Sequence, residues 1–255
     1  GVEVPEGSVS NQPYSVFMDI YAAMSRAHMR TYGSTQAQIA AVSAKNHVHS
    51  THNPLAQYRK PYTVEAVLAA PPIVFPLTLP MCSPISDGAA AAVICNSAGL
   101  RKLAVSDDRA IRVLASVLQT SAERDPYDYD RHVTRLAAMR AYAMAGLGPL
   151  DVDVAEVHDA TAMGEIIEIE ALGLVPPGEG GIAAERGDTV IGGRIPVNPS
   201  GGLECKGHPI GATGLGQIYE LVSQLRGDAG ARQIEGARVA VAQNGGGVLG
   251  VEEAV

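Results

Sequence analysis

The residues best suited to chemistry lie in the run NPSGGLECKGHPIGATGLGQ, which spans residues 198–217. The run places His208 between a glycine and a proline, before apolar residues that recur at steps of three and four and so predict an amphipathic helix. The positive end of a helix dipole disfavours a protonated imidazole. A neutral imidazole can accept a proton from a nucleophile or donate a hydrogen bond to an oxyanion. Gly202 and Gly207 let a ligand approach the backbone closely, so we treat them as candidate ligand-binding positions.

A second histidine, His158, ends the apolar stretch VAEVHDA and precedes a helical pattern. Catalytic side chains often lie at this position in α/β folds. Taken alone, a buried histidine bonded to the backbone is the simpler interpretation. The neighbouring Asp159 either orients its neighbours or caps the following helix, because aspartate accepts backbone N–H bonds.

A third candidate is Asn244, which is followed by Gly245, Gly246 and Gly247. Consecutive glycines permit positive φ angles and expose backbone N–H groups. We therefore consider Asn244 and Gly246 as catalytic groups of an oxyanion hole, with Gly245 and Gly247 against a ligand. By itself, the pattern is more typical of an ordinary glycine turn between strands.

The elements that must position these residues alternate between strands and helices. Strands are predicted at 87–97, 111–121, 154–160 and 237–247, and helices at 130–148, at 161–174 and after the glycine–histidine–proline turn. This alternation predicts a layered α/β fold with a mixed five-stranded sheet between helices.

The N-terminal part is predicted to be an irregular helical lobe. Helices are expected at 13–32, 36–50 and 63–69, the last two opened by hydroxyl caps. Residues 46–62 are polar and lack periodicity, which predicts a loop containing His47, His49 and His52. Their spacing fits no strong zinc signature and no acidic or cysteine ligand accompanies them, so no metal is predicted.

Composition excludes several classes of protein. The 255 residues are 46% hydrophobic and carry a net charge of −8, with no basic stripe, which argues against a nucleic-acid partner. The longest apolar run is too short for a transmembrane helix, so no membrane association is expected. The three cysteines are scattered and odd in number, which is consistent with a reducing compartment and a cytoplasmic location.

The run around His208 resembles the glycine–histidine–proline signature of the thiolase superfamily. Three further segments resemble the family in the expected order, namely CSPISDGAAAA at 82–92, EVHDATAMGEIIEIEALG at 156–173 and QNGGGVLG at 243–250. His158-Asp159 stands where the degradative and biosynthetic thiolases carry Asn-Glu. The chain therefore resembles the sterol-carrier-protein and lipid-transfer-protein branch.

The resemblance implies a thiolase-type acyltransferase that makes or cleaves a C–C bond beside a coenzyme A thioester, with β-ketoacyl-CoA thiolysis favoured over condensation. Coenzyme A is then a substrate, and no permanently bound cofactor is expected. His158 and His208 would converge on the thioester oxygen, and His208 would also deprotonate a cysteine nucleophile. Two alternatives are a thiolase-fold aldolase acting on a hydroxyacyl-CoA and a non-catalytic thiolase-like subunit.

The sequence departs from the family where a second acid/base cysteine is usual. Gln243 begins the glycine turn and Ala160 follows Asp159, and neither side chain can transfer a proton. This His-Asp-Ala form resembles thiolases that work with a small OB-fold, zinc-ribbon partner, and related aldolases acting on steroid side chains. A homodimer or a higher oligomer is also expected.

The resemblance covers only the later part of a thiolase. It implies a loop domain at 1–85, the end of the N-terminal half at 86–105 and a C-terminal domain at 106–255. The family's nucleophilic cysteine is expected in a part of the protein that precedes these residues. Cys205, three residues before His208, is an alternative nucleophile. Cys82 and Cys95 are predicted to be structural thiols.

Overall fold

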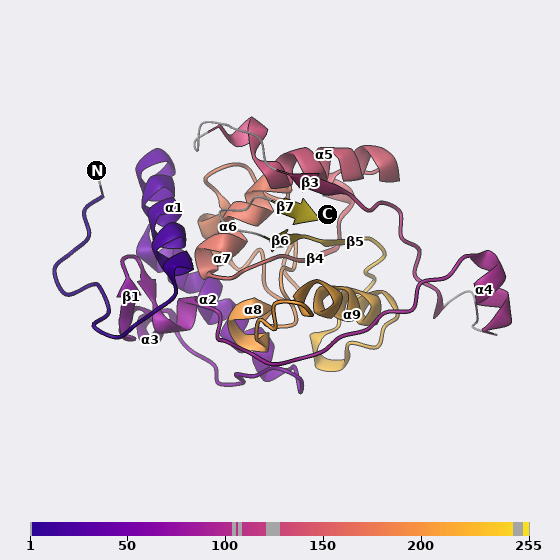
Figure 1. Ribbon diagram of the computed structural model, residues 1–255, viewed down its shortest axis with the longest axis horizontal. Coiled ribbons are helices and arrows are strands. Elements are labelled where there is room, and N and C mark those ends of the chain that lie inside the picture. Colours follow the sequence, from indigo (N-terminus) through magenta and orange to yellow (C-terminus); the bar gives the residue numbers. More distant parts are fainter. Residues whose placement is uncertain (1, 104–105, 107–108, 121–127, 247–251, 255) are drawn as a thin grey trace.

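Short strands occupy the centre of the computed structural model, which describes residues 2–103, 106, 109–120, 128–246 and 252–254. Helix α5 (Val133–Ala145) covers one side of these strands, and α8 (Gly202–Lys206) and α9 (Thr213–Leu225) lie on the other, as Figure 1 shows. The predicted layered α/β fold is confirmed. The domain boundaries at residues 85 and 105 stay a prediction.

The N-terminal lobe is built from helices that begin at hydroxyl residues. The side chains of Ser15, Thr35 and Thr63 each accept a backbone N–H bond from the first turn that follows. The lobe contains α1 (Val16–Tyr32), α2 (Gln36–Thr51), α3 (Val64–Leu68), the hairpin strands β1 (Pro72–Val74) and β2 (Leu77–Thr78), and the 3₁₀ turn η1 (Leu79–Met81). Helix α2 packs against α3, α6, α7 and α8, so it joins the lobe to the layers that carry the candidate site.

The remaining elements follow from Ser97 onward. They are α4 (Ser97–Lys102), β3 (Leu118–Thr120), η3 (Tyr129–Arg131), α5, η4 (Pro149–Asp151), β4 (Val154–Glu156), α6 (Ala162–Ala171), α7 (Gly180–Arg186), α8, α9, η5 (Gly230–Arg232), β5 (Ala240–Ala242), β6 (Asn244–Gly246) and β7 (Glu252–Ala254). Strand β4 pairs in parallel with β5, whereas β3, β7 and β6 form an antiparallel sheet. These five strands are therefore divided between two sheets.

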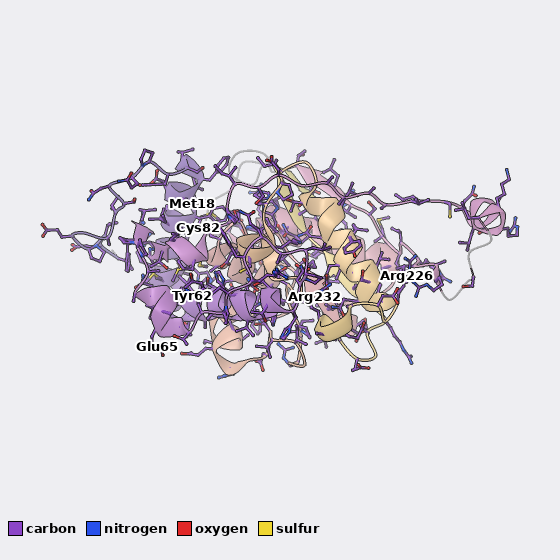
Figure 2. The ribbon with its side chains drawn as sticks, turned by 90° about the horizontal axis from the view of Figure 1, so that it is seen from below. Met18, Tyr62, Glu65, Cys82, Arg226 and Arg232 are labelled. Carbon is purple, nitrogen blue, oxygen red and sulfur yellow. The ribbon has the colours of Figure 1, made fainter. Side chains whose placement is uncertain are left out.

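Two predicted strands differ from the structure. Residues 87–96 are extended but form no strand, and Val93 and Ile94 are 84% and 86% exposed. This segment leads to α4, which projects away from the body in both Figure 1 and Figure 2. An extended segment becomes a strand only beside another strand, and no described strand pairs with it. At 111–121 only Leu118–Thr120 is a strand, and residue 121 lies outside the described residues.

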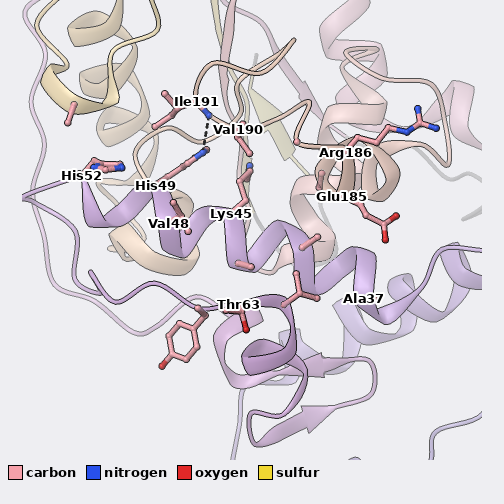
Figure 3. Close-up of a pocket in the computed structure, with 17 residues that line it drawn as sticks. Ala37, Lys45, Val48, His49, His52, Thr63, Glu185, Arg186, Val190 and Ile191 are labelled. Carbon is pink, nitrogen blue, oxygen red and sulfur yellow. Dashed lines mark hydrogen bonds between the residues drawn. The ribbon is translucent and has the colours of Figure 1, made fainter.

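The predicted loop at residues 46–62 begins later than expected, and only residues 52–62 lie outside regular structure. Helix α2 continues to Thr51, and His47 and His49 are buried in it rather than facing solvent. The His49 Nδ1 atom lies 3.0 Å from the carbonyl oxygen of Asn198, and Nε2 accepts the N–H of Ile191 at 3.1 Å (Figure 3). The helix looks unperiodic in sequence because polar side chains on its inner face bond to distant backbone.

Two apolar clusters support the site from either side. One joins α1, α2, the β1–β2 hairpin and the start of α6, with Ile39, Leu77 and Met163 at its centre. The other joins β4 and β5 to α5 and the end of α6. Within the described part of the chain, no helix combines the length and apolar character that a membrane crossing requires.

The attachment of α2 through His49 predicts an acid-sensitive stability. Burial, followed by the charge of Lys45, lowers the pKa of His49 to about 3 from an ordinary 6.5, so unfolding takes up a proton between these values. The stability supplied by neutral His49 is fully present above pH 6.5 and is lost as the pH falls toward 3.

We expect His49→Gln to remove this titration. The difference in free energy of unfolding between wild type and variant should narrow by up to about 1.4 kcal/mol per pH unit as the pH falls below the unfolded pKa. Urea unfolding at about pH 7 and about pH 5 measures it, because the upper part of the titration window lies between these two pH values. A difference that stays constant with pH would contradict the assignment.

Candidate active site

The two candidate histidines lie side by side. The ring centroids of His158 and His208 are 4.9 Å apart and the ring planes meet at 90°. His158 follows β4, and His208 occupies the turn between α8 and α9. The structure thus brings together two imidazoles that are distant in sequence.

His158 is positioned by the parallel pairing of β4 and β5. Glu156 is opposite Ala242 in the register, so the residues that follow both strands leave at the same sheet edge. There, the His158 N–H donates to Gln243 Oε1 at 2.9 Å, and His158 Nδ1 is 3.2 Å from Asn244 Oδ1. The sequence indicated Asn244 but missed the positioning role of Gln243.

His208 is held at its backbone and at one ring nitrogen. Its N–H donates to Ser86 Oγ at 3.0 Å, and Nδ1 lies 2.7 Å from Thr213 Oγ1. The Thr213 hydroxyl itself donates to the Pro209 carbonyl at 3.1 Å, so its oxygen is left to accept a hydrogen bond from Nδ1–H. His208 therefore keeps a free lone pair on Nε2, which is the form a general base requires. The sequence analysis missed Thr213, although a hydroxyl five residues after His208 was an available signal.

Both imidazoles are neutral near pH 7. Burial lowers the pKa of His158 to about 4, assisted by the charges of His208 and Lys206. Burial also lowers the pKa of His208, and the Lys206 ammonium adds to this effect. The sequence analysis attributed a neutral His208 to the dipole of the following helix. The dipole is not the cause, because α9 begins only at Thr213, five residues beyond the histidine.

Asp159 caps a helix, but not the one that follows it. Thr161 caps α6, whereas Asp159 Oδ1 accepts the N–H of Leu203 at 2.7 Å in the first turn of α8. The other carboxylate oxygen accepts from Asn46 Nδ2 at 3.2 Å. Asp159 thereby fixes α8, the helix that leads to His208.

The two glycines predicted to bind ligand allow close contacts within the protein. A Cβ atom on Gly202 would lie 2.0 Å from Asp159 Oδ2, and one on Gly207 would lie 2.7 Å from Ser86 Oγ. Their φ angles of +63° and +108° also favour glycine. Gly207 additionally lines a hollow of about 880 Å³ beside the turn, together with Ser86, Lys206 and Thr213. Contact of either glycine with a ligand stays a prediction.

The predicted glycine turn is a strand over its first residues. Asn244, Gly245 and Gly246 form β6 and pair with β7, which directs the Asn244 side chain to His158. Gly247 lies outside the described residues. An oxyanion-binding role of Asn244 and Gly246 stays a prediction, as does a ligand contact of Gly245 and Gly247.

The three cysteines are unsuited to act as the nucleophile here. Burial, followed by the charges of Glu204 and Asp159, raises the pKa of the Cys205 thiol well above its ordinary value. Burial also raises the pKa of Cys82. Cys95 is exposed on the extended segment, so its prediction as a core thiol was wrong.

The orientation of helix α9 differs from the sequence prediction, because part of its predicted apolar face is exposed and polar residues of the other face are buried. Leu215 and Ile218, on the predicted apolar face, are 42% and 39% exposed, whereas Gln217, Glu220 and Gln224 are buried. Gln217 donates to the Gln243 carbonyl at 2.8 Å. The polar side chains of the inner face form hydrogen bonds around the buried Leu221, and the apolar face remains open beside the histidine turn.

A second hollow lies apart from the histidine pair. It has a volume of about 670 Å³ and is bounded by α2, α3 and the end of α7, with Lys45, His49 and Arg186 among its lining residues. Figure 3 shows Lys45 and His49 directed from α2 toward the segment that carries Ile191. Neither His158 nor His208 lines it.

Comparison with known proteins agrees with this architecture. The family described as thiolase C-terminal domain-like matches residues 115–255, more than half of the chain. The acetyl-CoA acetyltransferase of Methanothermobacter thermautotrophicus is 46% identical over 235 residues, covering 92% of this chain and 61% of the relative. Sterol carrier protein 2 of Bos taurus is 40% identical over 260 residues, covering 97% of this chain and 47% of the relative.

The chain therefore belongs to the thiolase family, and its relatives place it with the sterol-carrier-protein type. The fold is also similar to that of the Ltp2–ChsH2(DUF35) aldolase, with a TM-score of 0.73 and 21% identity over 96% of this chain and 68% of the other. The chain spans about half to three fifths of the length of these curated relatives.

The bond between His208 and Thr213 yields a prediction about the imidazole tautomer. Thr213→Val removes the acceptor of Nδ1–H, so we expect the ratio of Nδ1–H to Nε2–H tautomers to fall about tenfold, the equivalent of one net hydrogen bond of about 1–1.5 kcal/mol. Nitrogen-15 shifts of the labelled imidazole report the ratio. Thr213→Ser keeps the hydroxyl and should behave as wild type; equal tautomer ratios in the Val and Ser variants would refute the assignment.

Proposed function

We propose that the complete protein is a thiolase-type acyl-CoA acyltransferase, which makes or cleaves a C–C bond beside a coenzyme A thioester. The observation that supports this most directly is the pair of neutral imidazoles, His158 and His208, with ring centroids 4.9 Å apart. One ring can act as a base toward a thiol while the other faces the thioester oxygen. Such paired stabilisation of an oxyanion commonly contributes about 3–4 kcal/mol per donor.

In the proposed cleavage, His208 Nε2 takes the proton of a cysteine thiol, and the thiolate attacks the keto carbonyl of a β-ketoacyl-CoA. The Nε2–H that results can then donate to the developing oxyanion. His158 can donate from Nε2 when the Asn244 amide presents its nitrogen, rather than its oxygen, to Nδ1. The β6 strand, with Asn244 and Gly246, would form the second wall of the site.

The C–C bond then breaks: the acyl group stays on the cysteine, and the electron pair of the bond forms the enolate of the departing CoA thioester, which is protonated as it leaves. The thiol of a second coenzyme A then takes the acyl group from the cysteine.

The nucleophile of this proposal is a cysteine outside residues 1–255. Raised pKa values keep the thiols of Cys82 and Cys205 protonated, so both are poor nucleophiles. Cys95 is exposed on the extended segment that leads to α4. The hollow beside Gly207 and Thr213 supports the proposal, because it gives an incoming thiol or thioester access to the histidine turn. Coenzyme A enters as a substrate, and no permanently bound cofactor is proposed.

We further propose that cleavage of a β-ketoacyl-CoA is favoured over condensation. Gln243 stands where many thiolases carry a second acid/base cysteine, and Ala160 follows Asp159. The absence of a second proton-transferring thiol at both positions also favours an alternative, retro-aldol cleavage of a hydroxyacyl-CoA. That reaction needs a base for the hydroxyl and an enolate-stabilising site, but forms no acyl-cysteine.

The proposed protein is a homodimer or larger assembly, and a small OB-fold, zinc-ribbon protein is a candidate partner. The open apolar face of α9, with Leu215 and Ile218 beside the histidine turn, supports a further protein surface at this position. A cytoplasmic location stays part of the proposal. A non-catalytic subunit is less well supported, because both imidazoles and their positioning bonds are present.

The experiment that tests the function uses the complete gene product. After mixing with an acyl-CoA, intact-mass and peptide mass spectrometry should find an acyl adduct on a cysteine other than the three described here. His208→Ala should slow the appearance of this adduct by about 10²- to 10⁴-fold, the usual contribution of a general base. His52→Ala changes an exposed histidine that lines the other hollow, so this variant is the matched control and should acylate normally.

Two results would overturn the acyl-transfer assignment. Normal acylation in His208→Ala would show that His208 is not the general base. An adduct on Cys205 would identify a different nucleophile. Cleavage of a hydroxyacyl-CoA without any acyl adduct would select the aldolase alternative instead.

A further inference from the structure

One buried ion pair connects the two segments that carry the histidines. Glu156 lies two residues before His158, and Lys206 lies two residues before His208. The Lys206 ammonium donates to Glu156 Oε2 at 3.2 Å, and the two side chains are 16% and 0% exposed. The ion pair therefore joins the strand that precedes His158 to the helix that precedes His208.

The Glu156 carboxylate also contacts the far end of the segment that leads to His208. Its Oε1 accepts the N–H of Ser200 at 3.1 Å, and Oε2 accepts the Ser200 hydroxyl at 2.8 Å. The carboxylate therefore binds residues on both sides of α8. Because Glu156 belongs to β4, these bonds fix the beginning and the end of the α8 segment against the strand that carries His158.

We propose that Glu156 and Lys206 are positioning residues that set the geometry of the histidine pair and keep a cation beside both imidazoles. The catalytic meaning of this inference rests on the proposed function, but its structural content does not. Neither residue touches the imidazole atoms assigned to the reaction, so each acts through the backbone and through its charge.

The charge of Lys206 acts on both rings in the same direction. An ammonium nearby disfavours a second positive charge, and its contribution lowers the pKa of His158 and of His208 beyond the effect of burial. The ion pair with Glu156 stabilises the lysine cation in a buried place, where an unpaired cation would be costly.

Two further buried carboxyl groups lie near this ion pair: Asp159, on which the charges of Lys206 and Glu156 both act, and Glu204, two residues before Lys206 in α8. Glu220, whose charge acts on Glu156, is bound by Arg232 at 2.9 Å. Asp87 is exposed on the segment that contains Ser86. Lys206 lowers the pKa of both rings, so removing the lysine charge should raise both pKa values.

Three variants distinguish the effect of the Lys206 charge from the effect of its side-chain packing. Lys206→Met removes the cation and leaves Glu156 unpaired. The double variant Glu156→Gln/Lys206→Met removes both charges and avoids a buried unpaired ion, so it keeps the test valid if the single variant fails to fold. Lys206→Arg is the matched control, because it keeps the positive charge.

The main measurement is a nuclear magnetic resonance titration of the labelled imidazoles. We expect the midpoints of His158 and His208 to move to higher pH in the double variant and to stay near the wild-type values in Lys206→Arg. In the complete protein, the acid limb of the kcat/KM profile should move the same way. Activity should fall about 10- to 100-fold in the double variant, because misplacement of a catalytic group by about 1 Å has an effect of this size.

A folded double variant with unchanged midpoints would overturn the proposal, as would equal shifts in the Met and Arg variants. The titration reads the imidazoles directly. A wild-type protein without acyl-transfer activity would therefore refute the proposed function only. The same titration would still confirm or refute the role of the ion pair.

Discussion

The architecture around the site depends on the need to satisfy charges buried between α2 and α6. Lys45 binds Glu165 where both side chains are almost fully inaccessible, and it also donates to the Val197 carbonyl at 2.9 Å. Glu165 accepts two further bonds, from Asn46 at 3.0 Å and from Asn198 at 2.8 Å. A buried ion pair is tolerated only when its remaining lone pairs and protons are satisfied. Three separate segments must therefore meet in one arrangement.

The position of the histidine pair depends on this arrangement. Asn198, held at a positive φ of 51°, also accepts the Val157 N–H at 2.8 Å and so binds the strand end that carries His158. Asn46 shares its amide between Glu165 and Asp159, and Asp159 in turn fixes the start of α8. A disturbance at Lys45 would thus reach both imidazoles by short chains of hydrogen bonds, although Lys45 contacts neither.

Local signals in the sequence were sufficient for most helices and for the two histidines. Hydroxyl caps such as Thr35 and Thr63 act within one helical turn, so they can be read without knowledge of the fold. Other features depend on partners far along the chain. His49 looked like a solvated loop residue because its acceptor is on Asn198, and residues 87–96 looked like a strand although none of the described strands pairs with them. No local pattern encodes such contacts.

The least conventional feature of the site follows from the groups that Gln243 must bind. Its side-chain oxygen is occupied by the His158 N–H and its carbonyl by Gln217, and the residue is fully buried. An amide at this position fixes a histidine but cannot carry a proton. In the proposed reaction, proton transfer is then confined to the imidazoles and to groups supplied by substrate or partner. This confinement makes their neutrality at pH 7, maintained by burial and by Lys206, a requirement of the chemistry rather than a by-product of packing.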